Sequence, residues 1–311
     1  MADVGVSMPV VDAVAPRPET VPVSRLRIYM LLALGIGCIG LSAIFTRLAD
    51  VPGTVSAFYR VAICEIALLP LFLRSFRHGE ITRDRRLWLL ALGTGVFFAL
   101  DLGLWNTSLF ITTAANATLL ANDAPIIVGL IALLVFRERL KPSYWMGLAM
   151  ALAGMGIIVG QDALHGAGHI GFGDALALSA GVAYALYLVL TQRLRVHLNT
   201  LASLWIPGLS GTVLLLIFNL LLRHELWGFS AGTWLALLGL GLISQVVGWL
   251  AINYVLGHLP ASITSVTLLC QPVLTALFAV PLLGEALAPH QIVGGLVTLT
   301  GIYLVNRGFN R

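Results

Sequence analysis

The sequence predicts an all-α polytopic membrane protein with ten transmembrane helices, arranged as two inverted repeats of five helices. Three observations predict this class: an apolar composition, a series of span-length apolar runs, and a passage that occurs twice. Of the 311 residues, 59% are hydrophobic and 10% are charged, whereas an ordinary soluble domain has about 25% charged residues. A soluble fold could not keep this much apolar sequence away from water.

Apolar runs follow one another along the whole chain. About 20 apolar residues are needed to cross the hydrocarbon core of a bilayer as a helix. Each run is expected to be helical, because an open backbone cannot face lipid. The expected spans are 27–48, 54–73, 87–109, 114–136, 144–160, 172–192, 200–222, 232–256, 261–283 and 289–306.

These spans leave little chain for any soluble domain. We expect a disordered cytoplasmic tail over 1–26, a first five-helix repeat over 27–160, a connecting loop over 161–171 and a second repeat over 172–307. The tail is rich in proline and has no apolar core after a basic start, so it does not resemble a signal peptide. All three cysteines fall inside expected spans, which favours apolar packing over a disulfide or a zinc site.

The basic residues are concentrated on one side of the expected bundle. With ten spans both termini share a side, and of the 18 Lys and Arg residues only Arg47, Arg60 and Arg223 lie away from it. The positive-inside rule therefore predicts that both termini are cytoplasmic. The basic stretch "RSFRHGEITRDRR" is then an orientation signal, so the lipid bilayer is an expected partner and nucleic acid is not.

A passage near the middle of the chain recurs near its end. Residues 114–158 match residues 261–305 at an offset of 147 without gaps, and the same offset places Asn106 on Asn253. The shared positions include two prolines, a glutamate and two glycines, which chance similarity between apolar segments would hardly preserve together. Because each copy has an odd number of spans, the second enters the bilayer from the opposite side. Inverted repeats of this kind are common in secondary transporters.

Each copy carries a proline in the middle of a span, at Pro125 and Pro272. Proline removes a backbone donor, so we expect a helix kink at each position. Asn122, Asp123 and Gln271 are polar at the same depth. A freed carbonyl beside a polar side chain suits a ligand site or a hinge, and a kink healed by neighbouring helices is the alternative.

The last span of each copy is rich in glycine and has almost no polar atoms. Small residues allow transmembrane helices to approach closely, so we expect these two helices to pack as a scaffold. The glycines concerned are Gly147, Gly154, Gly156, Gly294, Gly295 and Gly301.

The segment "NATLLANDAPIIVGLIALLVFRERLKPSYWMGLAMALAGMGIIVG" resembles the signature region of the EamA-type drug/metabolite transporter superfamily, whose ten-helix members carry two such domains. The resemblance covers about residues 27–306, and Arg60 in "FYRVAICEI" matches an arginine common early in the family's second helix. It implies export of metabolites or drugs across a bacterial inner membrane, through a central cavity and by alternating access. The aromatic amino acid exporters are the branch that this chain resembles. One departure is "PLLGEALAP" in the second copy, which lacks the basic residues of "FRERLKP", as suits a turn on the outer side.

Polar and aromatic side chains recur at helical spacing in five spans and predict the wall of a cavity. Positions three and four apart share a helix face, and polar groups that face lipid are costly, so these stripes should face inward. Trp and Tyr offer stacking faces, although ordinary packing or an interfacial belt is the alternative for any one of them. The expected substrate-binding residues are Ser42, Trp105, Asn106, Asn122, Tyr184, Tyr187, Gln245, Trp249, Asn253 and Gln271.

Few charged residues lie within the spans, so each one is a candidate for function. We expect Asp101 to couple transport to protons or to bind an ammonium group of the ligand, and Asp123, beside the kink, is the second candidate. Glu65 lies five residues after Arg60 and therefore on a different face. We expect it to play a structural role opposite an arginine of another helix.

The leading hypothesis is a secondary exporter of amino acids, in particular aromatic ones. An exporter of cationic drugs or other small metabolites is the alternative, because quaternary amines also bind aromatic faces. The chain has no nucleotide-binding motif and no room for a nucleotide domain, which argues against an ATP-driven pump. No cofactor, metal site or catalytic residue is expected. A membrane-embedded enzyme would need a nucleophile or metal cluster, and a receptor-like binder would need no inverted repeat.

Overall fold

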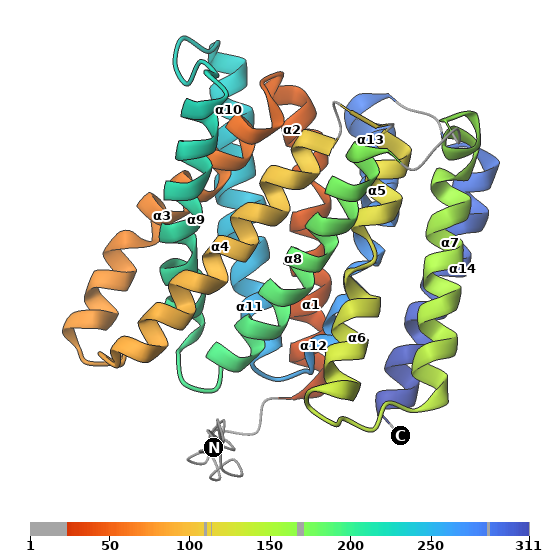
Figure 1. Cartoon of the computed structure of the whole chain (residues 1–311), viewed down its shortest axis with the longest axis horizontal. Helices are drawn as coiled ribbons and strands as arrows, with labels where there is room; N and C mark the ends of the chain where they lie inside the picture. The colour runs from red at the N-terminus through yellow and green to blue at the C-terminus, as the bar shows by residue number, and fades with distance from the viewer. Residues whose placement is uncertain (1–23, 109–110, 113, 167–170, 285–286, 311) are drawn as a thin grey trace, which may run out of the picture.

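The computed structural model describes residues 24–108, 111–112, 114–166, 171–284 and 287–310 (Figure 1). The described residues form helices and connecting turns, with no strand among them. The predicted all-helical, two-repeat membrane fold is confirmed. The expected tail over 1–26 lies outside the described residues except for its last three, of which Arg25 already begins the first helix.

Ten helical units follow one another in the order expected from the apolar runs. Those of the first repeat are α1 (Arg25–Gly40) with α2 (Ser42–Ala49), α3 (Gly53–Arg77), α4 (Arg85–Ser108), α5 (Ala114–Ala121) with α6 (Ala124–Leu134), and α7 (Pro142–Gly166). Those of the second are α8 (Phe172–Leu194), α9 (Thr200–Leu221), α10 (Ala231–Gly239) with η1 (Leu240–Gly248) and α11 (Trp249–Leu256), α12 (Ala261–Leu268) with α13 (Cys270–Leu283), and α14 (Pro289–Asn310).

Most of the helical units have the length that a bilayer requires. Among the described residues, eight helical units are long and apolar enough to cross a membrane, and Ala124–Leu134 and Pro142–Ile158 are shorter apolar helices. α7 continues as a helix to Gly166, so it occupies the first part of the predicted connecting loop over 161–171. The helix was missed there because the apolar run ends before the helix does.

Polar side chains at the N-termini fix where several helices begin. The Asn199 side chain accepts a hydrogen bond from the Ala202 amide at 2.8 Å at the start of α9. The Ser230 hydroxyl accepts one from the Thr233 amide at 3.1 Å at the start of α10. Each cap satisfies a backbone donor that the first turn of a helix leaves unpaired.

The two repeats pack so that equivalent helices exchange partners. α4 lies on α8, and the span equivalent to α4, made of α10, η1 and α11, lies on α1, the equivalent of α8. α6 also packs on α8, as α13 packs on α1, while α3 packs on its own equivalent α9. This exchange is the signature of an inverted repeat and places the repeat interface along the middle of the bundle. The two ends of the described chain, the start of α1 and the end of α14, lie at the same end of the bundle (Figure 1).

The glycine-rich helices α7 and α14 lie side by side at one edge of the bundle (Figure 1). A Cβ atom added at Gly147 would lie 2.6 Å from the Gly301 carbonyl oxygen, and one added at Gly154 would lie 2.6 Å from the Gly294 carbonyl oxygen. These two contacts are related by the repeat symmetry. Four of the six glycines therefore bring the two helices together as predicted.

The remaining two glycines do not take part in this crossing. A Cβ at Gly156 would meet nothing within 4 Å, and one at Gly295 would meet Val273 of α13 at 3.4 Å. The prediction was wrong for them because glycine content alone does not say which face of a helix meets a neighbour.

Substitution of Gly154 by alanine is expected to destabilise the protein. The added methyl group would lie 2.3 Å from the Thr298 hydroxyl oxygen and 2.4 Å from its amide nitrogen, and such overpacking costs about 1–3 kcal/mol. Thermal unfolding of the purified protein in detergent measures the effect. Gly156→Ala is the matched control on the same helix, and equal melting temperatures for the two variants would contradict this account of the crossing.

Several spans are interrupted near their middle. The break between α5 and α6 falls at Asn122 and Asp123, directly before the Ala124–Pro125 start of α6. The break between α12 and α13 falls at Leu269, three residues before Pro272. Proline cannot continue the backbone hydrogen-bond ladder. Discontinuous helices of this kind commonly surround the substrate site of a transporter.

The eighth span contains a π-helix over Leu240–Gly248. Its glycines allow close packing against the first repeat: a Cβ added at Gly241 would lie 2.6 Å from Ile63 of α3. The Ser244 hydroxyl donates a hydrogen bond to the Cys38 carbonyl of α1 at 2.7 Å. The equivalent part of α4 is α-helical, so this segment is a local departure from the repeat symmetry.

Candidate functional site

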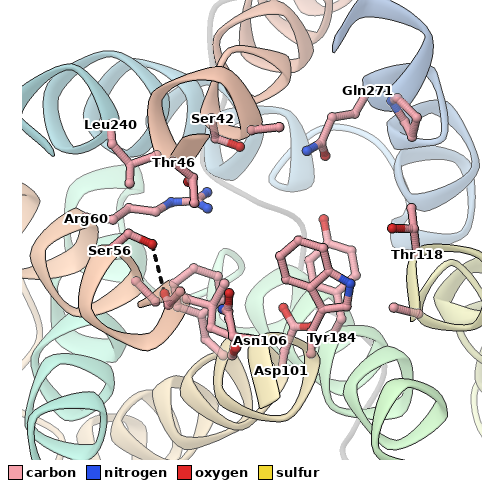
Figure 2. Close-up of a pocket in the computed structure, with 18 of the residues that line it drawn as sticks. Ser42, Thr46, Ser56, Arg60, Asp101, Asn106, Thr118, Tyr184, Leu240 and Gln271 are labelled. Carbon is pink, nitrogen blue, oxygen red and sulfur yellow. Dashed lines mark hydrogen bonds between the residues drawn. The ribbon is translucent and has the colours of Figure 1, made fainter. Parts of the chain in front are cut away.

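A cavity of about 380 Å³ lies between the two repeats, in the half of the bundle that is remote from both termini. Its wall is made by α2, the first two turns of α3, the last turns of α4, α5 with the break that follows it, and residues from α8, η1, α11 and α13. Figure 2 shows the side chains arranged around a hollow. The site thus lies at the repeat interface, where inverted-repeat transporters bind their substrates.

The other half of the bundle, toward the termini, is closed. Leu32 of α1, Leu188 of α8 and Leu256 of α11 are buried members of one hydrophobic cluster, and each is closer to that end than the lining residues of its own span. The Arg195 guanidinium also ties α8 to the end of α11, because its Nε donates to the Asn253 carbonyl at 2.9 Å. The cavity is therefore separated from the end that carries the termini.

Four of the predicted neutral polar residues line the cavity: Ser42, Asn106, Asn122 and Gln271. The amide nitrogen of Asn122 donates to the Thr118 carbonyl at 2.7 Å, and that of Asn106 donates to the Leu102 carbonyl at 2.6 Å. These bonds fix the orientation of both amide groups at the wall. Pro272 lines the cavity beside Gln271.

The predicted aromatic residues Trp105, Tyr184 and Trp249 also line the cavity. Phe98, Tyr184, Tyr187 and Trp249 form an aromatic cluster that joins α4, α8 and α11. In this cluster Phe98 stacks on Tyr187 with ring centroids 4.7 Å apart, and Trp249 meets both rings edge-on at 5.4 and 5.2 Å. Tyr187 is 1% exposed and lies behind the lining residues.

Charges of both signs face the cavity. Asp101 of α4 and Arg60 of α3 both line it, and in Figure 2 their charged groups point toward the same hollow. The Arg60 Nε donates to the side-chain oxygen of Gln245 at 2.6 Å. Arg47 of α2 is also part of the wall.

Asp123 and Pro125, both predicted at the helix kink of the fourth span, do not line the described part of the cavity. Asp123 packs against Gly181 of α8, where an added Cβ would lie 1.6 Å from the carboxylate Oδ1. This Oδ1 is buried without a hydrogen-bond partner. Pro125 is buried, and its carbonyl accepts a hydrogen bond from the Tyr144 hydroxyl at 3.3 Å.

Gln245 and Asn253, predicted to share a cavity face with Trp249, also lie outside the described wall. The prediction assumed α-helical spacing of four residues, but Gln245 belongs to the π-helix. A π turn takes more residues than an α turn, so Gln245 is directed toward Arg60 of α3 instead. Asn253 lies one turn beyond Trp249, where its side-chain nitrogen donates to the Trp249 carbonyl at 3.0 Å.

The expectation that Glu65 faces an arginine of another helix is wrong. Its carboxylate packs against Gly208 of α9, where an added Cβ would lie 1.9 Å from Oε1, and its Oε2 is buried without a hydrogen-bond partner. The Trp205 indole of α9 donates to the Glu65 backbone carbonyl at 3.0 Å. Glu65 therefore belongs to the α3–α9 contact.

Sequence reasoning missed Ser56 and Thr118, which both line the cavity. Ser56 is four residues before Arg60, and Thr118 is four residues before Asn122, so helical spacing from known polar residues would have found them. In Figure 2 the Ser56 hydroxyl donates to the Gly53 carbonyl at 2.8 Å. Within the described ranges, no group of three or more His, Cys, Asp or Glu side chains is placed to hold a metal ion.

The chain is similar in sequence to proteins named as transporters over most of its length. The family model for the "EamA-like transporter family" matches residues 26–160 and 171–307. An "Uncharacterized transporter" of Archaeoglobus fulgidus is 25% identical over 277 residues, which cover 89% of this chain and 95% of that protein. The "Uncharacterized transporter YdfC" of Bacillus subtilis is 26% identical over 251 residues, 79% of each chain.

One similar protein has a name that specifies a substrate. The "Probable terminal-alkyne amino-acid exporter" of Streptantibioticus cattleyicolor is 26% identical over 196 residues, 62% of this chain and 64% of that protein. A solved structure described as "Crystal structure of protein" superposes with a TM-score of 0.77 at 20% identity, covering 90% of this chain and 96% of that one. At this identity the superposition shows a similar fold and no more.

Proposed function

Because the chain belongs to the EamA-like transporter family, we propose that it is a secondary transporter that exports amino acids, aromatic ones above all, by alternating access. The observation that carries this proposal is the cavity between the repeats, where one carboxylate, Asp101, lies among the aromatic side chains of Trp105, Tyr184 and Trp249. We assign the ammonium group of the ligand to Asp101 and its ring to these aromatic faces, which favour planar apolar groups. We assign hydrogen bonds with the remaining polar groups of the ligand to Ser42, Asn106, Asn122 and Gln271.

The size of the cavity supports a small ligand. At about 380 Å³ it lies near the lower end of the roughly 300–1,000 Å³ of known ligand pockets. A single amino acid suits this volume better than a large drug. The name of the Streptantibioticus cattleyicolor relative points to the same class of substrate.

Alternating access follows from the arrangement of the repeats. The cavity occupies one half of the bundle while the half near the termini is closed. We place the protein in a bacterial inner membrane. The distribution of basic residues puts both termini in the cytoplasm, so the cavity faces the outside. Exchange of conformations between the inverted repeats then opens the cytoplasmic half. The helix breaks at Leu41, Asn122–Asp123 and Leu269 are the natural hinges.

Asp101 is also the candidate for coupling to protons. Carboxylates inside membrane proteins commonly mark proton relays and substrate pathways, and Asp101 lines the cavity that the substrate would occupy. Asp123 has no place in the described wall, so we give it a lesser role, at the break of the fourth span. Tyr187, Gln245 and Asn253 would act behind the wall by holding its residues.

Transport by the purified protein in liposomes tests the proposal. The expected result is saturable flux of labelled phenylalanine that unlabelled tryptophan inhibits, with methionine and threonine as weaker competitors. An imposed pH gradient then tests whether protons drive the flux. Methyl viologen flux in the absence of any amino acid flux would overturn the proposal in favour of a cationic drug exporter. That alternative is supported by the carboxylate and aromatic faces, which together suit a quaternary amine.

A further inference from the structure

Arg60 is a cation in the wall of a cavity inside the membrane. Guanidinium groups in such places are costly, and they normally pair with an anion or with several carbonyl groups. Among the described residues, the hydrogen bond that Arg60 makes is the one from its Nε to the side-chain oxygen of Gln245, at 2.6 Å. Gln245 is neutral, so this bond orients the guanidinium without neutralising its charge.

The remaining donors of Arg60 point toward the hollow. Because Nε is taken by Gln245, the two terminal nitrogens stay available, and Figure 2 shows them directed into the cavity. A guanidinium presents its donors as a planar fork that matches a carboxylate in a bidentate arrangement. The free part of Arg60 is therefore suited to an anionic group of the ligand.

The neighbouring elements hold Gln245 in place. Gln245 is 1% exposed and lies on the π-helix η1. The adjacent Ser244 hydroxyl bonds to the Cys38 carbonyl of α1, and Gly241 fits closely against Ile63 of α3. The π-helix is thus fixed to both helices that flank it. Gln245 is a positioning residue in this arrangement, since it lies outside the described wall and acts through Arg60.

Asp101 faces the same hollow with the opposite charge and forms no hydrogen-bonded ion pair with Arg60 among the described residues. A ligand with one charge would leave the other residue unpaired in a partly desolvated site, which is unfavourable. We propose that Arg60, positioned by Gln245, binds the carboxylate of the substrate, so that the cavity selects free α-amino acids carrying both an ammonium and a carboxylate group. This inference rests on the proposed function and narrows its substrate class.

Calorimetric titration of the purified full-length protein in detergent tests the inference with three probes. L-phenylalanine carries both charges, 3-phenylpropionate lacks the ammonium group, and phenethylamine lacks the carboxylate. The wild-type protein is expected to bind phenylalanine tightest and phenethylamine about ten- to hundredfold more weakly, the usual effect of losing a hydrogen bond to a charged group. Equal affinity for phenylalanine and phenethylamine would overturn the inference without any variant.

Arg60→Gln supplies the second measurement. It is expected to weaken phenylalanine and 3-phenylpropionate binding by about tenfold or more and to leave phenethylamine binding unchanged or improved, because a repelling cation is gone. Retained phenethylamine binding also shows that the variant is folded. Arg60→Lys keeps the charge without the fork and should give an intermediate affinity for phenylalanine.

Two comparison variants separate carboxylate binding from a general effect of charge. Arg47→Gln makes the same charge change elsewhere in the wall, so loss of 3-phenylpropionate binding there, with retention in Arg60→Gln, would overturn the assignment to Arg60. Gln245→Leu should weaken phenylalanine binding while leaving phenethylamine binding unchanged. A merely structural role for Gln245 would instead weaken both probes equally, which would contradict its positioning role.

The inference and the proposed function fail in different ways. Binding of 3-phenylpropionate that depends on Arg60, in a protein that moves no amino acid in liposomes, would retain the carboxylate site and overturn the proposed function. Phenylalanine transport that Arg60→Gln leaves at the wild-type rate and affinity would retain the proposed function and overturn the inference.

Discussion

Replacement of Asp101 by asparagine is expected to lower phenylalanine transport about ten- to hundredfold, because hydrogen bonds to charged groups contribute about 1.5–3 kcal/mol. Asn keeps the size and shape of the side chain but removes the charge that would bind the ammonium group. Asp101 lies in the cavity wall and is only partly exposed. The measurement is the initial rate of labelled phenylalanine flux in liposomes at matched protein density.

The same change should lower the transport rate of phenethylamine more than that of phenylalanine. A zwitterion keeps its carboxylate contact when Asp101 is neutralised, whereas an amine loses its one ionic partner. If Asp101 also couples transport to protons, the residual flux should lose its dependence on an imposed pH gradient. Wild-type rates for both compounds in the Asp101→Asn protein would remove both roles of Asp101.

Asp50→Asn is the matched control for this experiment. Asp50 follows α2 outside the described cavity wall, with left-handed backbone angles of φ 51° and ψ 47°. Asparagine tolerates this conformation as well as aspartate does. The same chemical change at Asp50 should therefore leave the transport rate near that of the wild type, and a loss as large as that of Asp101→Asn would show that the effect is not specific to the cavity.

Replacement of Trp249 by alanine is expected to have the largest effect on stability, about 3–5 kcal/mol of unfolding free energy, as for other buried aromatic residues. Trp249 is 2% exposed and contacts three other rings of the aromatic cluster. The same change removes an aromatic face from the cavity, so phenylalanine transport should fall as well. Thermal unfolding in detergent and liposome flux measure the two effects.

Trp249→Phe separates packing from hydrogen bonding. The Trp249 indole nitrogen is buried without a hydrogen-bond partner, so phenylalanine loses no bond and keeps a ring in the cluster. We expect it to retain most of the stability and transport. Trp227→Ala is the control, because Trp227 is 75% exposed and its truncation should change little. A Trp249→Ala protein as stable as Trp227→Ala would contradict the structural role of the cluster.

The fold was largely predictable because the bilayer leaves few choices. A span must be apolar over a fixed thickness and must satisfy its own backbone. The ten apolar runs therefore appear in the structure as helices whose ends differ by a few residues from the prediction. The repeated prolines and glycines then identified the duplication without any structural information.

The sequence predicted which face of a helix meets the cavity, but not how far along the helix the cavity extends. Helical spacing placed Tyr184 and Tyr187 on one face, yet only Tyr184 reaches the described cavity wall, because Tyr187 lies one turn closer to the closed end. Spacing along one helix carries no information about where a cavity between several helices ends. The same limit applies to Asn253, one turn beyond Trp249.

The sequence also could not predict which side chains from distant helices contact each other. The residue that orients Arg60 is 185 positions away in sequence, and Glu65 meets a glycine of α9 rather than the expected arginine. No pattern within one span identifies such a neighbour. Arg60 could be noticed from the sequence, but its role required the position of the π-helix across the bundle.

The π-helix also marks a difference in length between the two copies of the repeat. Trp88, Leu92 and Gly93 of the third span fall on Trp234, Leu238 and Gly239 at an offset of 146, whereas Asn106 falls on Asn253 at 147. The second copy therefore holds one extra residue between these positions, and η1 lies there. A π turn absorbs such a residue without breaking the helix.

One residue inserted or deleted in this span after the duplication thus adds a difference in backbone length to the differences in sequence between the two halves. An exchange of shapes between identical halves would give two states of equal energy, but these halves are no longer identical. Under the alternating access that we propose, the outward-open and inward-open forms would therefore differ in energy before any substrate binds.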